Sequence, residues 1–349
     1  MKIGILTGGG DCPGLNAVIR GVVRKSLLLG NEVYGIKNGW KGLLEKDYYQ
    51  LDHNAISGIL HRGGTILGSS RTNLYQEGKD YYNQAIKNFK DMGLDALVAI
   101  GGEDTLGVAA KLYKDGINVV GVPKTIDNDL SATDYTFGFD TAVNIATEAI
   151  DRLHTTAESH NRVIVVEVMG RHAGWIALHS GLAGGADITL IPEKPFDLDE
   201  VCKALTTRHG RGKSFSIVVI AEGAKINTEN DGDEDGSFVL QKLEKDSFGH
   251  VSLGGIGNIV AEEIERRTGY ETRAVVLGHI QRGGTPTAFD RVLGSRFGVK
   301  AAELVESGGF GQMTSLQGSD IISVSLDEAV GTLKTVDEDI YNSASTFFG

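Results

Sequence analysis

The chain has 349 residues, of which 41% are hydrophobic and 23% are charged, and these globular proportions exclude a chain that is disordered throughout. The formal net charge of −12 argues against a nucleic-acid coat protein and a polybasic membrane binder, although local arginines could still bind an anionic substrate. Because the two cysteines are far apart and no apolar run reaches about 18 residues, we expect no disulfide scaffold, structural zinc site or membrane span. The chain begins as a strand and a glycine turn, unlike a signal peptide, so we expect a cytoplasmic protein.

Short runs rich in β-branched residues alternate with longer stretches of helical period. The predicted strands cover residues 2–7, 32–36, 96–100, 118–122, 162–168, 187–191, 214–221 and 272–277. The predicted helices cover residues 15–29, 81–92, 106–115, 141–158, 174–182, 198–209, 254–267 and 288–307. Several strands are continuous apolar runs, which is typical of parallel strands covered on both faces. The alternation predicts an α/β fold, and at roughly 100–200 residues per domain the length favours two domains.

The first predicted strand ends in a glycine-rich turn, residues 7–14, that leads into a helix. Three consecutive glycines are more than a tight turn needs, and N–H groups at a helix N-terminus favour an anion. We therefore favour phosphate binding over a plain turn. The glycine spacing matches neither the dinucleotide fingerprint nor the P-loop, which argues against a Rossmann oxidoreductase and a P-loop NTPase.

A second glycine- and serine-rich loop, residues 63–71, ends in Arg71. Its guanidinium could hold a phosphate through two N–H groups. The alternative is an ordinary surface arginine.

The third loop follows the strand 96–100, where two glycines precede Glu103 and Asp104 at the start of a helix. These carboxylates could cap the helix or could hold Mg²⁺ beside phosphates. Ligands of open α/β sheets collect at the carboxyl ends of strands, so a second such loop favours the magnesium–phosphate interpretation.

The fourth loop, residues 123–129, carries Lys124, Asp127 and Asp129 just beyond a predicted strand. One carboxylate could accept a proton from an attacking hydroxyl while the other coordinates a metal. Lys124 supplies a compact cation for phosphate oxygens. The alternative is an Asx-turn loop, and this motif alone does not decide between the two.

Residues 227–236 are strongly acidic and turn-forming. We interpret them as a solvated surface loop or a partly disordered segment. A calcium-binding loop is the less favoured alternative, because the acidic spacing is irregular.

Six motifs in chain order resemble those of the 6-phosphofructokinase family: TGGGDCPGLN, GGTILGSSR, GGEDT, PKTIDND, EVMGR and GHIQRGG. The resemblance implies two three-layer α/β domains of similar topology with mostly parallel sheets, and Mg²⁺-dependent phosphoryl transfer to the 1-hydroxyl of fructose 6-phosphate. It also implies a phosphoryl-donor domain of residues 1–138 plus 282–330. The fructose 6-phosphate domain would be residues 139–281 plus 331–349.

The resemblance also implies roles for individual residues. Asp127 resembles the base that accepts the sugar hydroxyl proton, and Arg171 could stabilise the transferring charge. Thr125 and Asp129 flank this base. The metal site is matched by Asp129 and by Glu103, a position where many relatives have Asp. The implied donor-binding residues are Gly10, Arg71, Gly102, Asp104, Thr105 and Lys124. The implied sugar-phosphate-binding residues are Thr125, Asp127, Arg162, Met169, Gly170, Arg171, Glu222, Arg273, His279 and Arg282.

Arg162 and Arg273 resemble arginines that relatives lend across a subunit interface to the 6-phosphate. The resemblance therefore implies a homo-oligomer, either a dimer or a tetramer.

Two positions bear on the phosphoryl donor. Asp104 and Lys124 stand where ATP-using members of the family typically have glycine. A carboxylate at the position of the α-phosphate of ATP would repel it, and two unit charges about 4 Å apart cost several kcal/mol where water is excluded. The pair resembles the pyrophosphate-dependent members, which implies pyrophosphate as donor and a reversible reaction. The alternatives are an ATP-dependent 6-phosphofructokinase and a sugar-phosphate sensor without turnover.

Effector control is expected to be weak. Arg20, Arg24, Arg211 and Lys213 match parts of the arginine-rich effector pocket of regulated relatives, but histidines, His53 and His154, replace two of its arginines.

Overall fold

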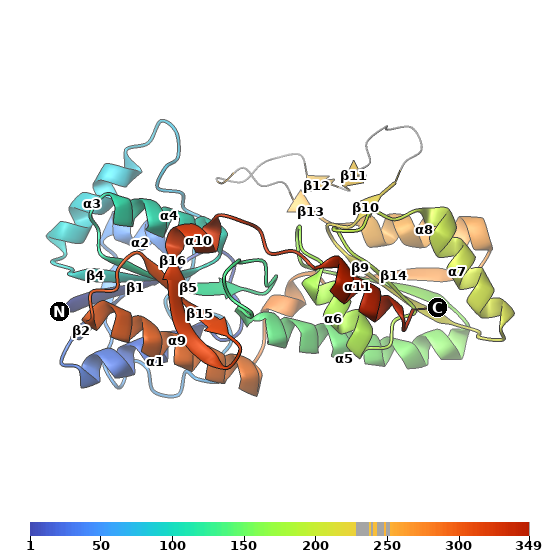
Figure 1. Cartoon of the computed structure of the whole chain (residues 1–349), viewed down its shortest axis with the longest axis horizontal. Helices are drawn as coiled ribbons and strands as arrows, with labels where there is room; N and C mark the ends of the chain where they lie inside the picture. The colour runs from blue at the N-terminus through green and yellow to red at the C-terminus, as the bar shows by residue number, and fades with distance from the viewer. Residues whose placement is uncertain (228–236, 239, 243–247, 249–251, 349) are drawn as a thin grey trace.

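The computed structural model describes residues 1–227, 237–238, 240–242, 248 and 252–348. Its strands form two main sheets that lie next to each other along the long axis of the molecule (Figure 1). The expected α/β fold with two largely parallel sheets is confirmed. The prediction made for the acidic residues 227–236 falls, apart from Asn227, outside the described residues.

The larger sheet is parallel except at its two edges, where β3 pairs antiparallel with β2 and β16 pairs antiparallel with β15. Its strand order is β16 (Asp320–Ser325), β15 (Gln312–Gln317), β5 (Val119–Thr125), β4 (Ala96–Gly101), β1 (Lys2–Thr7), β2 (Glu32–Ile36) and β3 (Tyr48–Gln50), and the short β6 (Phe137–Gly138) pairs with β5. Almost every residue of β1, β4 and β5 is buried, because helices cover both faces of these apolar strands.

Two groups of helices cover this sheet. One face carries α1 (Leu15–Leu28) and α9 (Ala288–Glu306). The other face carries α2 (Trp40–Glu45), α3 (Tyr81–Asp91), α4 (Glu103–Lys114) and α10 (Leu326–Val330). Glycines let α1 and α9 pack backbone to backbone: a Cβ on Gly21 would lie 2.7 Å from the carbonyl oxygen of Ser295.

The smaller sheet is parallel throughout. Its order is β14 (Thr272–Val276), β7 (Val163–Val168), β9 (Ser216–Ala221) and β8 (Ile188–Leu190). One face packs against α5 (Phe139–His160) and α6 (Trp175–Ala183), and the other against α7 (Leu198–Gly210) and α8 (Ile256–Thr268). The remaining elements are η1 (Gly278–Arg282), α11 (Glu338–Ser345), and two small antiparallel ladders, β10 (Lys225–Ile226) with β11 (Ser237–Phe238) and β12 (Leu240–Lys242) with β13 (Ser252–Leu253).

All eight predicted strands and all eight predicted helices are present, with ends that shift by at most three residues. Short elements such as α2 and β3, and also the hairpin of β15 and β16, were not predicted. This hairpin mixes polar with apolar residues, so it lacks the continuous apolar run by which the central strands were predicted. Within the part of the chain that the structure describes, no helix has the length and apolar character needed to cross a bilayer.

A buried carboxylate fastens the two halves of the molecule together. Asp290, in the first turn of α9, is fully buried and accepts the N–H groups of Gly138 and Thr141, each at 2.9 Å, at the start of α5. It also accepts the hydroxyl of Thr141 at 2.5 Å. Burial raises the pKa of Asp290 to about 6. Because folding raises this pKa, the contribution of Asp290 to the free energy of unfolding is largest at low pH. It decreases as the pH rises from about 4 through about 6.

Replacing this carboxylate gives a stability prediction. Asp290→Ala should lower the free energy of unfolding by about 2–4 kcal/mol, because three buried donors lose their acceptor. Asp290→Asn keeps one acceptor oxygen and should cost less. Urea denaturation at neutral pH measures both. Equal costs for the two variants would show that the hydrogen bonds are not the cause.

Candidate active site

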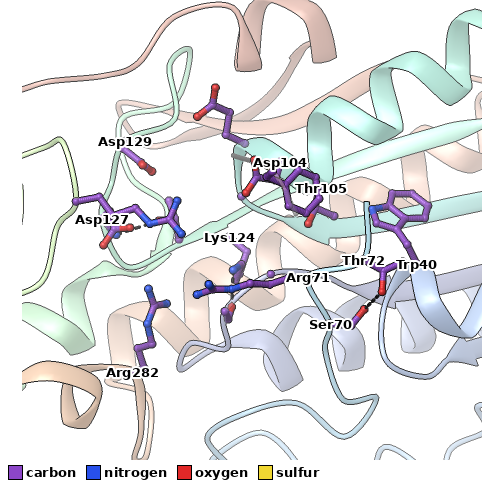
Figure 2. A pocket seen from close by; sticks show the side chains of 17 residues that line it. Trp40, Ser70, Arg71, Thr72, Asp104, Thr105, Lys124, Asp127, Asp129 and Arg282 are labelled. Atoms are coloured by element: carbon purple, nitrogen blue, oxygen red, sulfur yellow. Dashed lines mark hydrogen bonds between the residues drawn. The ribbon is translucent and has the colours of Figure 1, made fainter. Parts of the chain in front are cut away.

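One pocket lies where the carboxyl ends of β1, β4 and β5 meet the turn that follows β7. In Figure 2, Lys124 lies near the centre, with Arg71 and Arg282 to one side and Asp104, Asp127 and Asp129 to the other. The structure thus brings together most of the predicted site residues: Gly10, Arg71, Gly102, Glu103, Asp104, Thr105, Lys124, Thr125, Asp127, Asp129, Arg171 and Arg282.

The three consecutive glycines of the first loop, Gly8, Gly9 and Gly10, each occupy a position that disfavours a side chain. A Cβ on Gly8 would lie 2.5 Å from Oγ1 of Thr105, and Gly9 has a φ of +78°. A Cβ on Gly10 would lie 2.7 Å from Nη1 of Arg282, so a side chain there would displace that guanidinium. The loop is therefore shaped to bring backbone N–H groups and an arginine close together, an arrangement that suits an anion.

Lys124 lies under this loop at the end of β5. Its side chain is only 4% exposed, and its Nζ donates a hydrogen bond to the carbonyl of Gly10 at 2.5 Å. Burial lowers the pKa of Lys124. A buried ammonium is costly unless negative charge lies nearby, so the site favours an anion in front of Lys124.

The turn after β5 holds the predicted base. Asp127 is 4% exposed, and its N–H donates to Oγ1 of Thr125 at 3.0 Å. Among the described residues, no group forms a hydrogen bond with Oδ1 of Asp127, although this atom is buried. Burial, followed by the charge of Asp127, raises the pKa of Asp129. An unpaired, buried carboxylate oxygen is available to a substrate proton or a metal ion.

The carboxylates fit a magnesium ion that is shared with phosphates. Within the described ranges, no three acidic, histidine or cysteine side chains are placed to hold a metal by themselves. Mg²⁺ commonly uses one or two carboxylates together with waters and substrate phosphates. Glu103 and Asp129, the predicted metal ligands, both line the pocket, and the nearby negative charge of Asp127 further favours a cation there.

The smaller sheet contributes a strained turn at the end of β7. Gly170 has a φ of +145°, and a Cβ there would lie 2.5 Å from the carbonyl oxygen of Ala173. Arg171 has a φ of +51°, which is rare for a non-glycine residue, and its N–H donates to Oε1 of Glu222 at 3.2 Å. Burial, with a further contribution from Asp127, raises the pKa of Glu222 to about 7. Local strain of this kind is often found at functional sites.

Other predicted residues lie outside this pocket. Met169 donates its N–H to Oε1 of Gln281 at 3.4 Å, and His279 is exposed on the same short helix as Arg282. Gln281 is fully buried and joins the end of β7 to η1, a role that the sequence analysis missed. Its only sequence signal is its place within GHIQRGG.

Arg162 and Arg273 lie away from the pocket within this chain. Arg162 precedes β7 and Arg273 is in β14, whereas Arg171 follows the carboxyl end of β7. Both arginines bind Glu271, at 2.7 and 2.6 Å. Their predicted contribution across a subunit interface stays a prediction.

The sequence analysis also missed Trp40, Ser70 and Thr72, which line the same pocket (Figure 2). Ser70 donates to Oγ1 of Thr72 at 3.0 Å. Ser70 lies within the predicted loop 63–71, next to Arg71, whereas Trp40 and Thr72 lie outside the six motifs and carry no charge that would have marked them.

A glycine loop, a buried cation and paired carboxylates at the ends of parallel strands are the parts that phosphoryl transfer requires. The sequence matches the family described as phosphofructokinase over residues 2–305. The chain therefore belongs to the phosphofructokinase family.

Known proteins of high similarity include two from Streptomyces coelicolor. The chain is 59% identical to a pyrophosphate–fructose 6-phosphate 1-phosphotransferase, with 100% of each sequence covered. It is 56% identical to ATP-dependent 6-phosphofructokinase 3, with 99% of each covered. Among solved structures, Pichia pastoris phosphofructokinase in the T-state superposes with a TM-score of 0.86 at 31% identity. That match covers 99% of this chain, which spans 39% of the Pichia chain.

Proposed function

We propose that this chain transfers a phosphoryl group from pyrophosphate to the 1-hydroxyl of fructose 6-phosphate. The products are fructose 1,6-bisphosphate and phosphate, and the reaction is reversible. The relatives with 59% and 60% identity that are named for this reaction support the proposal. Because an ATP-dependent relative is nearly as similar, the local residues must decide the donor.

The observation that carries the choice of donor is the buried ammonium of Lys124 beside the glycine loop, with Asp104 lining the same pocket. Lys124 places a positive charge where the terminal phosphates of a donor would lie. Asp104 adds a negative charge and bulk on the side where a third phosphate would extend. Pyrophosphate is short enough to bind the ammonium of Lys124 without approaching the carboxylate of Asp104.

The reaction needs little covalent chemistry from the protein. Asp127 accepts the proton of the 1-hydroxyl at its unpaired Oδ1, while Thr125 holds the backbone of this turn. Lys124 and Arg171 stabilise the charge of the transferring group. The groups proposed for the sugar and its 6-phosphate are Met169, Gly170, Glu222, His279 and Arg282, whereas Gly10, Arg71, Gly102 and Thr105 bind the donor.

Glu103 and Asp129 would hold Mg²⁺, which supplies positive charge to the phosphate oxygens when it is bound. The proposed donor domain comprises residues 1–138 plus 282–330, and the sugar domain residues 139–281 plus 331–349. In a homo-oligomer, Arg162 and Arg273 of one subunit would reach the 6-phosphate in the next.

A donor assay tests this function. Purified protein with Mg²⁺ and fructose 6-phosphate is given either pyrophosphate or ATP, and fructose 1,6-bisphosphate is measured. We expect turnover with pyrophosphate alone. Turnover with ATP would contradict the argument from Asp104 and Lys124. Binding of fructose 6-phosphate without turnover on either donor would favour the sensor; parallel assays with sedoheptulose 7-phosphate test the acceptor.

The pKa of Glu222 predicts how sugar binding depends on pH. A sugar hydroxyl donates best to the ionised carboxylate, and the pKa of Glu222 is raised to about 7. KM for fructose 6-phosphate should therefore fall by about 5- to 10-fold as the pH rises from about 6 to about 8. KM for pyrophosphate is the internal control and should change less. Glu222→Gln should remove the pH dependence; a dependence that persists in this variant would assign it to another group.

A further inference from the structure

Residues 331–337 form a C-terminal crossover that runs from α10, beside the larger sheet, to α11, on the smaller sheet (Figure 1). Its backbone attaches directly to the turn after β5. Leu333 forms an antiparallel bridge with Leu130, and the N–H of Lys334 donates to the carbonyl of Asp129 at 2.9 Å. The crossover is thus bonded to a residue proposed to hold the metal.

The side chain of Lys334 makes contacts on both sides of the crossover. Its Nζ donates to the carbonyls of Thr133 and Asp134 at 2.9 and 2.6 Å. The same ammonium lies 5.3 Å from the ring centroid of Trp175, the first residue of α6. The indole N–H of Trp175 donates to the carbonyl of Lys334 at 3.1 Å. One residue therefore links the segment after Asp129 to the helix that follows the Arg171 turn.

A second contact fastens the crossover to the same turn. Glu193 accepts the N–H of Val336 at 2.9 Å and also the N–H of Gly174 at 2.9 Å. Gly174 is the residue immediately before Trp175. Two independent contacts thus hold the crossover against the end of the turn that carries Arg171.

We infer that Lys334 is a positioning residue that holds the Asp127–Asp129 turn in register with the Arg171 turn, so that groups from both sheets face one reacting phosphate. The inference rests on the proposed function. An ammonium has three N–H donors, enough for two carbonyls while its charge lies near an aromatic ring. An apolar side chain leaves both carbonyls without this donor. Small errors in the placement of catalytic groups cost large factors in rate.

The test compares Lys334→Met, Lys334→Arg and a control, Lys46→Met, which removes a lysine paired with Asp91 on the surface. Lys334→Met should lower kcat by about 10- to 50-fold with KM for both substrates within about 2-fold. Lys334→Arg keeps the charge and the N–H donors and should restore most of kcat. Lys46→Met should behave as the wild type.

Hydrogen exchange supplies a readout that does not need turnover. Amides of residues 126–135 should exchange faster in Lys334→Met than in the wild type or Lys46→Met. Unchanged exchange in Lys334→Met would overturn the inference about Lys334. An inactive wild type would refute only the proposed function, because the exchange measurement does not need turnover. A kcat within about 2-fold of the wild type in Lys334→Met would also overturn the inference about Lys334.

Discussion

Asp127→Asn should lower kcat by about 10³-fold while leaving the affinity for fructose 6-phosphate nearly unchanged. The amide has the size of the carboxylate but cannot take the hydroxyl proton. Oδ1 of Asp127 is buried and has no hydrogen-bond partner among the described residues, so its lone pairs are available to the hydroxyl proton. Steady-state kinetics give kcat, and calorimetric titration of the sugar phosphate gives the affinity.

The matched control is Asp95→Asn. Asp95 accepts the N–H of Lys2 at 2.7 Å, at the amino ends of the strands and away from the pocket. This variant should keep the kcat of the wild type. A loss of less than about 10-fold in Asp127→Asn would show that another group accepts the proton and would remove Asp127 from the proposed mechanism.

The second large effect concerns the phosphoryl donor. The double variant Asp104→Gly, Lys124→Gly should lose about 100-fold in kcat/KM for pyrophosphate, because a buried charge-assisted contact of about 3 kcal/mol disappears. Turnover with ATP should rise from undetectable to measurable, since the carboxylate and the lysine side chain no longer occupy the donor side of the pocket. Both values come from the same coupled assay with each donor in turn.

Two comparisons keep this result interpretable. Asp199→Gly removes an acidic residue from the first turn of α7, where its side chain is 79% exposed, and should leave both donors unchanged. The melting temperature of the double variant shows whether glycine within β5 has unfolded the site. A folded double variant that retains the pyrophosphate activity and gains none with ATP would refute the assignment of donor choice to these two residues.

The central strands were predictable because their burial on both faces demands continuous apolar runs. The hairpin of β15 and β16 was not, because part of β15 buries polar side chains instead. Thr314 and Ser315 are fully buried, and Ser315 donates to the carbonyl of Ala132. That partner comes from a distant loop, so only the tertiary structure shows why a polar sequence can form an interior strand.

The charged and glycine-rich residues that directly follow predicted strands could be assigned to the site from the sequence. The reason is that the carboxyl ends of parallel strands meet at one edge of the sheet. Asp104, Lys124 and Asp127 therefore come together as expected. Trp40 carries no charge and lies in none of the six motifs. Gln281 lies within GHIQRGG, but an uncharged side chain there does not show that it supports the end of β7. Arg162 lies at the opposite end of β7 from Arg171, so within one chain it does not join the other predicted site residues.

The position of β15 also bears on the order in which a newly made chain can fold. β5 lies between β4 and β15 in the larger sheet, and α9 packs on α1 at the contact of Gly21 with Ser295. On the ribosome α9 and β15 are made after every strand of the smaller sheet. The smaller sheet can therefore form first. Until β15 is made, one edge of β5 has no partner strand and could pair with a wrong one. The sheet whose synthesis begins first is the one that is completed last.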